Sequence, residues 1–328
     1  MIRIFFTDLD LARFRIAAEP SPMWEILLSL HVLQIRTRSP IFRYWRDQTR
    51  QRLSRSMRPL FELAPAYGYS PDFLTPSIGD SNLEAGLDAL AATPRARLRA
   101  DLGQLAGYQQ VTSWMRELAD GRAASLGVLT DATRRYHQVA IAPYWTRIRA
   151  GVDAERTAHA RLLAATGFEG LMGVIHPDIR WRPPVLELHG FTANRDIHLD
   201  GRGLHLLPSY FCWQQPTLLR DPDLPPVLVY PIERDAVGLG VAGPAAPSDR
   251  KALVALLGRT RAAVLEAIDA GCTTTELARR VGVSPATASE HATVLREAGL
   301  ITTRRLGGSV LHSLHPLGAT ILTQQRHR

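Results

Sequence analysis

Hydrophobic residues in the first 175 positions recur mostly every three or four residues, the spacing that places them on one face of a helix. Trp24, Leu27 and Leu30 follow this spacing directly after Ser21-Pro22, a pair that is typical of a helix start. A second start signal is the capping box that runs from Ser81 to Glu84. The pattern predicts a short strand over residues 2–6 and then helices from residue 22, over 41–63, from 81, and over 94–106, 110–120, 123–140, 144–165 and 168–175.

The pattern changes between residues 178 and 232, where apolar positions alternate with polar ones between prolines and glycines, as in short β-strands. Asp200-Gly201 lies between two of these runs and predicts a hairpin turn. We therefore expect a mainly α, α+β protein in which residues 1–237 form a helical domain with a small β-layer at its C-terminal end. The candidate strands cover residues 179–181, 185–189, 196–199, 204–213 and 227–230.

Residues 238–248 are small, uncharged and rich in glycine and proline, which is typical of a linker. Gly238, Gly240 and Gly243 also match the glycine spacing of a dinucleotide-binding turn. Such a turn must be followed directly by a helix, and Pro244 and Pro247 block one here. We interpret the segment as a linker and keep nucleotide binding as the less favoured alternative.

Residues 249–328 carry the start and stop signals of a helix-turn-helix domain. The pattern predicts two helices, over residues 249–257 and 259–270. Thr273 and Glu276 then form a capping box that starts the first helix of the motif. Gly282 allows a sharp turn, and Ser284-Pro285 starts the second helix.

The helix that begins at Pro285 is expected to bury one stripe of small and apolar residues, Ala288, Ala292, Leu295 and Gly299. Its opposite face carries groups that can bond to base edges in the major groove. After it, two extended segments flank Gly307-Gly308 and predict a β-hairpin wing, and a short helix over 315–322 ends the domain. The predicted DNA-binding residues are Thr273, Thr274, Arg279, Ser284, Pro285, Ala286, Thr287, Ser289, Glu290, His291, Arg296, Arg304, Arg305 and Ser309.

The charge of the chain is concentrated in this last domain. The whole chain has a net charge of +8, almost all of it from arginine, since Lys251 is the only lysine. From Arg250 to Arg328 there are 11 basic and 5 acidic residues, which gives +6 for that part. A basic bias of this kind favours a polyanionic partner, here double-stranded DNA.

The run from Ser284 to Ile301 (SPATASEHATVLREAGLI), with the wing sequence from Arg304 to Leu311 (RRLGGSVL), resembles the winged-helix domain of the ArsR/SmtB regulators. The resemblance spans residues 250–322, under a quarter of the chain. It implies a homodimeric repressor that releases DNA when an inducer binds, and the two-fold symmetry of a dimer predicts an inverted-repeat operator. Residues 1–235 also resemble the long extension that some ArsR-like regulators carry.

One departure from that family concerns metals. Metal-sensing members carry a cysteine pair in the helix before the turn or Asp/His pairs in the last helix. Here Thr273 and Thr275 stand at the cysteine positions, Cys272 is alone, and the last helix offers only His315. The resemblance therefore implies neither a metal site nor a cofactor, and we expect no response to zinc, cadmium or arsenite.

Three histidines of the first domain, His189, His198 and His205, lie near Asp196 and Asp200 in the sequence. Their spacing matches no metal-binding motif, so we favour ordinary strand and core positions over a metal site. No nucleophile motif or phosphate-binding loop is present, and we expect no catalytic residue and no enzyme. The chain also has no secretory signal and no membrane-spanning run, which predicts a cytoplasmic protein without a membrane partner.

All six tryptophans lie in the first domain. Most are expected in the core, but a helical domain with a β-layer can also enclose an apolar pocket for a small molecule. Our first hypothesis is therefore a small organic effector bound in this domain. The alternatives are a platform for dimerisation or protein interaction and, third, an enzymatic domain. The candidate effector-binding residues are Trp24, Trp45, Trp145, Trp181 and Trp213.

Overall fold

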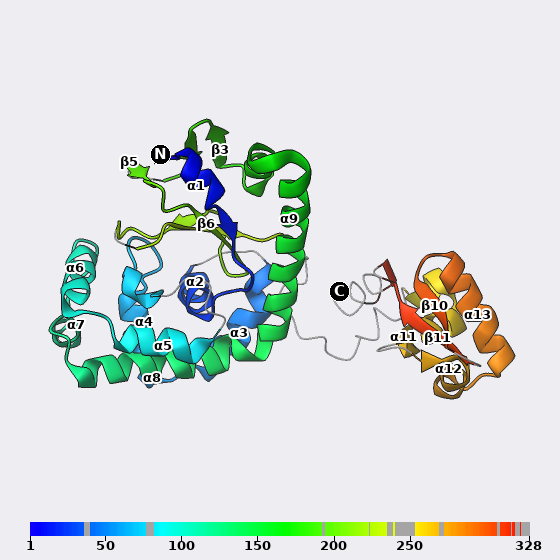
Figure 1. The fold of residues 1–328 in the computed structure, drawn as a ribbon. Coiled ribbons are helices and arrows are strands. Elements are labelled where there is room, and N and C mark those ends of the chain that lie inside the picture. Colours follow the sequence, from blue (N-terminus) through cyan, green and yellow to red (C-terminus); the bar gives the residue numbers. More distant parts are fainter. Residues whose placement is uncertain are drawn as a thin grey trace. The chain divides into compact units, whose positions relative to one another are not determined.

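The computed structural model separates the chain into two compact units, Met1–Leu239 and Gly240–Arg328, and each is described by itself (Figure 1). Among the residues that the structure describes, only residues 40, 304–306 and 309 are described by their backbone alone, without their side chains. The fold is α+β with a C-terminal helix-turn-helix, as the sequence predicts. The structure describes residues 1–35, 40–76, 82–191, 194–222, 224–234, 239, 253–268, 272–306, 309–315, 317–318 and 322.

Helices make up most of the first unit. The longest, α9, is broken at Gly167, whose φ of 72° lies in the left-handed region, so it consists of two helices that meet at this residue, as the sequence predicts. The α-helices are α1 (Asp8–Ala12), α2 (Pro22–Gln34), α3 (Arg43–Arg52), α4 (Arg58–Leu63), α5 (Leu83–Ala91), α6 (Arg95–Leu105), α7 (Ser113–Ala119), α8 (Ala123–Ala140) and α9 (Trp145–Ile175). Short 3-10 helices are η1 (Pro40–Phe42), η2 (Arg55–Met57), η3 (Asp72–Leu74) and η4 (Ala142–Tyr144).

Two of the predicted helices differ from the structure, one in its continuity and one in its start. The helix predicted over 41–63 is divided into α3, η2 and α4, because Pro59 cannot donate the backbone hydrogen bond that a continuous helix would need there. Ser81 lies outside the described residues, and the N-cap of α5 is Asn82, whose side chain accepts a hydrogen bond from the Glu84 backbone N–H at 3.0 Å.

The strands of the first unit form two four-stranded sheets instead of a single β-layer. Sheet A has the order β3-β4-β1-β5, and sheet B has the order β2-β6-β8-β7. Strands from the N-terminus join both sheets, so the β-structure does not belong to the C-terminal end alone. The strands are β1 (Ile2–Phe5), β2 (Arg15–Ile16), β3 (Ile179–Arg182), β4 (Val185–Leu188), β5 (Arg195–His198), β6 (His205–Ser209), β7 (Thr217–Leu218) and β8 (Val227–Pro231).

The hairpin predicted at Asp200-Gly201 is also wrong. Both residues have positive φ, 53° and 81°, so the chain does turn sharply there. The turn links strands of different sheets, since β5 pairs in parallel with β1 while β6 pairs in parallel with β2 and β8. A turn signal specifies the local backbone path but not the partner of each strand, which depends on residues far away in the sequence.

Sheet B separates two hydrophobic cores. In β6 and β8, Leu207, Val227 and Val229 contribute to one core, whereas the alternate residues Leu206 and Leu228 contribute to the other. Parallel strands that are buried on both faces consist of continuous apolar runs, which explains the composition of β8.

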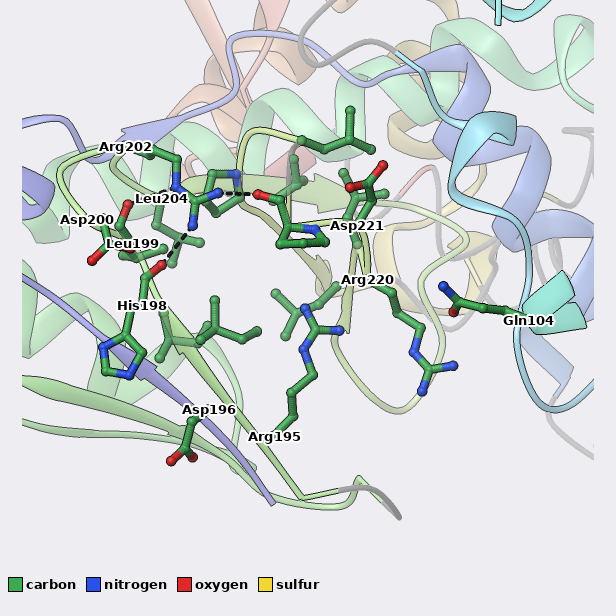
Figure 2. Close-up of a pocket in the computed structure, with 18 residues that line it drawn as sticks. Gln104, Arg195, Asp196, His198, Leu199, Asp200, Arg202, Leu204, Arg220 and Asp221 are labelled. Atoms are coloured by element: carbon green, nitrogen blue, oxygen red, sulfur yellow. Dashed lines mark hydrogen bonds between the residues drawn. The ribbon is translucent and has the colours of Figure 1, made fainter. Parts of the chain in front are cut away.

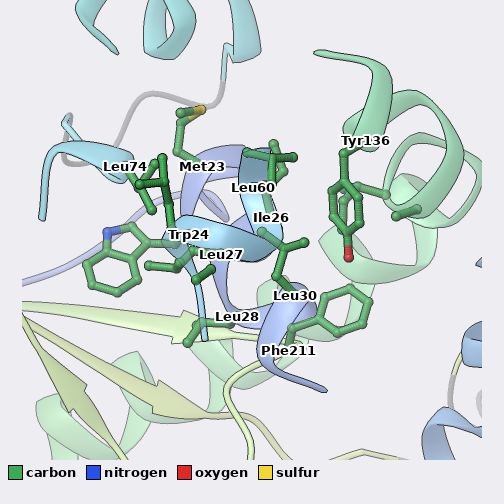
Figure 3. Packing of buried hydrophobic residues seen from close by; sticks show 14 of the residues in the cluster. Met23, Trp24, Ile26, Leu27, Leu28, Leu30, Leu60, Leu74, Tyr136 and Phe211 are labelled. Atoms are coloured by element: carbon green, nitrogen blue, oxygen red, sulfur yellow. The ribbon is translucent and has the colours of Figure 1, made fainter. Parts of the chain in front are cut away.

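Helix α2 lies at the centre of the larger core. Nearly all of its residues are buried, and Met23, Ile26, Leu27 and Leu30 pack among side chains of neighbouring helices and of Phe211 (Figure 3). A helix that is apolar on all sides is expected only when it is enclosed by other elements.

A buried carboxylate joins α2 to the end of β6. Glu25 is 1% exposed and accepts hydrogen bonds from the backbone N–H groups of Tyr210 and Phe211 at 2.8 and 2.9 Å and from the Ser209 hydroxyl at 3.1 Å. Burial raises the pKa of Glu25 to about 7 although these donors favour the ionised form. Because residues 210–213 turn to make these contacts, β6 ends at Ser209 and not at residue 213 as predicted.

The second unit is a winged helix. Its described elements are α11 (Arg259–Ala267), β9 (Cys272–Thr273), α12 (Thr274–Val281), α13 (Pro285–Glu297), β10 (Ile301–Leu306) and β11 (Ser309–Leu314). Residues 253–257 are also helical. The three strands pair in the order β10-β11-β9, and the core contains Leu265, Leu277 and Leu295.

Some boundaries at this end of the chain differ from the prediction. Leu239, placed in the predicted linker 238–248, is fully buried in the larger core of the first unit, so that unit extends past residue 237. Helix α11 ends at Ala267, three residues earlier than predicted. The rest of the linker and of its glycine motif, the start of the helix predicted at 249, and half of the helix predicted over 315–322 lie outside the described residues.

Candidate nucleic-acid interface

The two helices of the motif are each started by a hydroxyl cap. Thr273 Oγ1 accepts a hydrogen bond from the Glu276 backbone N–H at 3.3 Å, and Ser284 Oγ accepts one from the Thr287 N–H at 3.1 Å. Such caps satisfy backbone donors that lack a partner within the helix. Between the helices, Gly282 has a φ of 73°, which glycine adopts without strain. These local features determine how α13 leaves α12.

Helix α13 packs through a narrow stripe of small residues. Ala288, Ala292 and Leu295 are at most 1% exposed, and the alanines allow close approach to the preceding helices. Gly299, which was predicted to continue this stripe, is only partly buried and ends the helix instead, with a φ of 70°. The stripe leaves the opposite face of α13 free of core contacts.

That opposite face carries the predicted base-reading residues. Most of the predicted residues on α13 are exposed, and Thr287 and His291 are partly exposed. The Ser284 and Thr287 hydroxyls lie 2.8 Å apart, so both take part in the cap. The exposed residues on and just before α13 are Ser284, Pro285, Ala286, Ser289, Glu290 and Arg296.

A buried histidine connects α12 to the wing, and sequence analysis did not identify it. His312 on β11 is 4% exposed, and its ring nitrogens lie 2.9 Å from Thr274 Oγ1 and 3.1 Å from Thr303 Oγ1. Burial lowers the pKa of His312, and Arg296 lowers it further. The Thr274 hydroxyl is therefore held by a contact within the domain. No local signal distinguishes this strand histidine from an exposed one.

The wing is an antiparallel hairpin in which Arg304 pairs with Leu311 and Arg305 with Val310 along the backbone. The side chains of Arg304, Arg305 and Ser309, and the turn residues Gly307 and Gly308, lie outside the described part of the chain.

Exposed arginines also lie on α12. Arg280 pairs with Glu276 one helical turn earlier at 3.3 Å, and Arg279 is exposed beside it. Both side chains of this pair are partly exposed, so the ion pair adds little to stability, and its main effect is on the surface charge.

The first unit contains two neighbouring cavities, of about 500 and about 300 Å³. The larger is lined mainly by β5, by the segment after β5 and by the segment after β7 (Figure 2). The smaller lies against α2 and the segment around Tyr69. Both include Arg195, Leu218 and Arg220, so they meet at these residues. Sequence analysis did not single out either arginine, because the pairing of the two sheets creates their proximity.

The tryptophans proposed as effector-binding residues do not gather at one cavity. Trp24 lines the smaller cavity, and none of the other four lines either cavity. Trp45 is fully buried and donates its indole N–H to the Ala140 carbonyl at 2.7 Å. Trp213 packs against Phe42 beside it, Trp181 packs on Phe6 and Phe168 in the smaller core, and Trp145 lies against His137. These four tryptophans therefore make the contacts of core residues and do not line either cavity.

The histidines considered as metal ligands are also dispersed. His198, Asp196 and Asp200 line the larger cavity, whereas His189 lies near Glu187 and His205 begins β6. Within the residues that the structure describes, no three histidine, cysteine, aspartate or glutamate side chains lie close enough together to hold a metal ion. None of the helices in the described ranges is both long and apolar enough to span a membrane.

Residues 256–304 match the family described as Helix-turn-helix domain. Two solved structures are similar to part of the chain, HlyU from Vibrio cholerae and reduced HlyU from Vibrio cholerae. Both have 24% sequence identity, cover 24% of this chain and give a TM-score of 0.20; the matches cover 91% and 88% of the HlyU chains. No curated protein matches this chain. The winged helix and the family match together support a DNA-binding transcription regulator of the helix-turn-helix kind.

Proposed function

We propose that this protein is a dimeric transcriptional repressor of the ArsR/SmtB type that binds an inverted-repeat operator and releases it when a small organic molecule binds to the first unit. The observation that carries the DNA-binding part is the exposed face of α13, which begins at the Ser284 cap and is opposite the buried alanine stripe. In a helix-turn-helix, the N-terminal residues of this helix enter the major groove.

The proposed base-reading residues are Pro285, Ala286, Ser289, Glu290 and His291. Hydroxyl and imidazole groups can bond to base edges, and a carboxylate can accept a hydrogen bond from the cytosine amino group. The residues proposed to contact phosphate, or to orient those that do, are Thr273, Thr274, Arg279, Ser284, Thr287, Arg296, Arg304, Arg305 and Ser309.

An exposed leucine supports dimerisation through the second unit. Leu256, in the helical segment 253–257, is 71% exposed. We expect Leu256→Glu to shift the protein from dimer to monomer at micromolar concentration, because a carboxylate would lose most of its hydration in an apolar interface. Sedimentation velocity would measure the shift.

The matched control for this test is Val128→Glu, which places the same charge on a 45% exposed apolar residue of α8 in the first unit. It should leave the dimer intact. A wild-type protein that sediments as a monomer, with or without DNA, would contradict the dimer.

The cavities of the first unit support the effector. Their volumes lie at the lower end of the range of known ligand sites, and their linings combine leucines with a few polar groups, as in such sites. Release requires that the ligand bind the DNA-free state more tightly than the DNA-bound state, and a coupling of about 1–3 kcal/mol would change operator affinity about 5–150-fold.

The effector can be sought by screening small metabolites for a shift in the melting temperature of the first unit and then measuring operator affinity with each binder. Leu224→Trp, which fills part of the larger cavity, should abolish the response and leave DNA binding without ligand unchanged. If binders stabilise the protein but none weakens operator binding, the first unit is better explained as a dimerisation platform, the second candidate function.

A further inference from the structure

We propose that the cavities of the first unit bind an organic anion, whose acidic group contacts Arg195 and Arg220 and whose apolar body occupies the larger cavity. The proposal rests on the proposed effector function and gives the chemical class of the effector.

The site lies between the edges of the two sheets. Strand β5 is an edge strand of sheet A, and β7 is an edge strand of sheet B. Arg195 is the first residue of β5, and Arg220 lies two residues after β7. In Figure 2 the Arg195 side chain points towards the middle of the larger cavity and the Arg220 side chain points towards Gln104. Both residues line both cavities, so two cations from different segments lie at the junction of the cavities.

Among the described residues, no acidic side chain is in contact with Arg195. Its side chain is partly buried, and within the described residues its guanidinium makes no hydrogen bond or ion pair. Burial lowers the pKa of Arg195, the charge of Arg220 lowers it further, and Asp72 acts in the opposite direction. Because arginine keeps its proton in proteins, the unused donors of this group favour an anionic ligand.

Arg220 is held in place without being neutralised. Its guanidinium carbon lies 5.3 Å from the centre of the Tyr69 ring, and one nitrogen lies 3.4 Å from the Tyr108 hydroxyl. The Arg220 backbone N–H donates to Asp72 at 2.8 Å. These contacts fix the side chain and leave most of its donors available.

The acidic side chains around the cavities have other partners. Asp196 pairs with Arg3 at 2.6 Å, and Asp221 pairs with Arg97 at 2.9 Å. Asp72 accepts hydrogen bonds from the backbone N–H groups of Arg220 and Asp221, and burial raises its pKa to about 6, so it stays mostly ionised near neutral pH with these two N–H groups as its partners. Asp200 is exposed to solvent.

The remaining basic groups do not compete for the role of anion contact. Arg202 donates to the backbone carbonyls of His198, Leu199 and Pro222 with all three of its nitrogens and so holds that loop. His31, in the smaller cavity, lies 2.9 Å from Ser70 Oγ, and burial lowers its pKa to about 4, so it is neutral. The positive charge at the junction therefore comes from Arg195 and Arg220.

The rest of the larger cavity is suited to an apolar body. Leu199, Leu204 and Val227 line it and are fully buried, and Leu218 and Leu219 extend the apolar surface towards the arginines. On the other side of the junction, Trp24 is 3% exposed and its indole N–H has no hydrogen-bond partner among the described residues. A ligand acceptor that reaches the smaller cavity could satisfy this donor.

The test compares two fluorescent probes with the same ring system, 1-anilinonaphthalene-8-sulfonate and N-phenyl-1-naphthylamine, which lacks the sulfonate. With the full-length protein we expect the sulfonate to bind at one site per chain at least about tenfold more tightly than the neutral probe, because charge-assisted hydrogen bonds to arginine are worth about 1.5–3 kcal/mol. Arg195→Gln and, separately, Arg220→Gln should each remove most of this preference and leave the affinity of the neutral probe unchanged.

Arg58→Gln is the control, because Arg58 has a 79% exposed side chain that pairs with Glu62 on the surface, and its loss changes the net charge equally. This variant should keep the preference for the sulfonate. Melting curves establish that each variant is folded, and the two cavity arginines, on separate elements, provide independent tests. Equal binding of both probes, or a preference that survives both cavity substitutions, would overturn the proposal.

The same titrations, repeated with operator DNA present, separate this inference from the proposed function. Arginine-dependent binding that leaves operator affinity unchanged would support the anion site and contradict release by an effector at that site. Release of the operator by a neutral ligand, unchanged in both arginine variants, would support the proposed function and contradict the anion site.

Discussion

Replacing both Arg304 and Arg305 with alanine is expected to weaken DNA binding by roughly two to three orders of magnitude at 0.15 M salt, for all sequences alike. Each phosphate contact contributes about 0.9 to the slope of log affinity against log salt through release of counterions, which corresponds to about a fivefold gain in affinity at this salt. Two contacts per protomer in a dimer would give four in total. Fluorescence anisotropy over a salt series measures the affinity and the slope together.

The control for this experiment is the double substitution of Arg95 and Arg99, which removes the same charge from α6 in the first unit, where both arginines pair with Asp120. It should leave the slope within error of the wild type. If the wing variant keeps the full slope but prefers a different sequence, the wing contacts bases and the assignment to phosphate is wrong.

The second large effect is expected at Glu25. Glu25→Ala should lower the free energy of unfolding of the first unit by roughly 3–5 kcal/mol, because two buried backbone N–H groups and the Ser209 hydroxyl lose their acceptor. All six tryptophans lie in the first unit, so tryptophan fluorescence during urea unfolding reports on this unit alone.

Glu19→Ala is the control, since the Glu19 carboxylate is 42% exposed and pairs with Arg149 on the surface. It should change stability by less than about 0.5 kcal/mol. If Glu25→Ala lowers the free energy of unfolding no more than Glu19→Ala does, the buried carboxylate does not hold α2 to the end of β6.

The pKa of Glu25 also gives this effect a pH dependence. The folded-state value, about 7, lies above the value of 4.5 for an unperturbed glutamate, so folding favours the protonated form. The stabilisation linked to this proton is fully present below pH 4.5 and is lost as the pH rises through about 7. The difference in stability between the wild type and Glu25→Ala should therefore be larger at pH 5 than at pH 8.

The winged helix could be predicted from the sequence because its signals are local. Hydroxyl caps, a glycine turn and an alanine stripe each act within a few residues, and all of them agree on one arrangement. The helices of the first unit were also largely predictable, except for α1, which was not predicted, and where Pro59 divides a predicted helix.

The sheets of the first unit could not be predicted, because strand pairing joins residues far apart in the sequence. Strand β1 pairs with β4 and β5, nearly 200 residues away, and the Asp200-Gly201 turn does not reveal that β5 and β6 belong to different sheets. For the same reason the cavity arginines had no sequence signal: Arg195 and Arg220 meet only after both sheets have formed. The tryptophans were poor candidates for effector-binding residues, because large aromatic residues fill cores more often than they line binding sites.

Selection of bound sequences from random duplex DNA by the full-length protein tests whether α13 reads the operator. We expect an inverted repeat whose half-site centres lie about 10 base pairs apart. We also expect Ser289→Ala and His291→Ala to change the preferred bases within each half-site while the salt slope stays the same. Failure to enrich any sequence, or enrichment of the same sequence by the wild type and both variants, would contradict the assignment of α13 as the recognition helix.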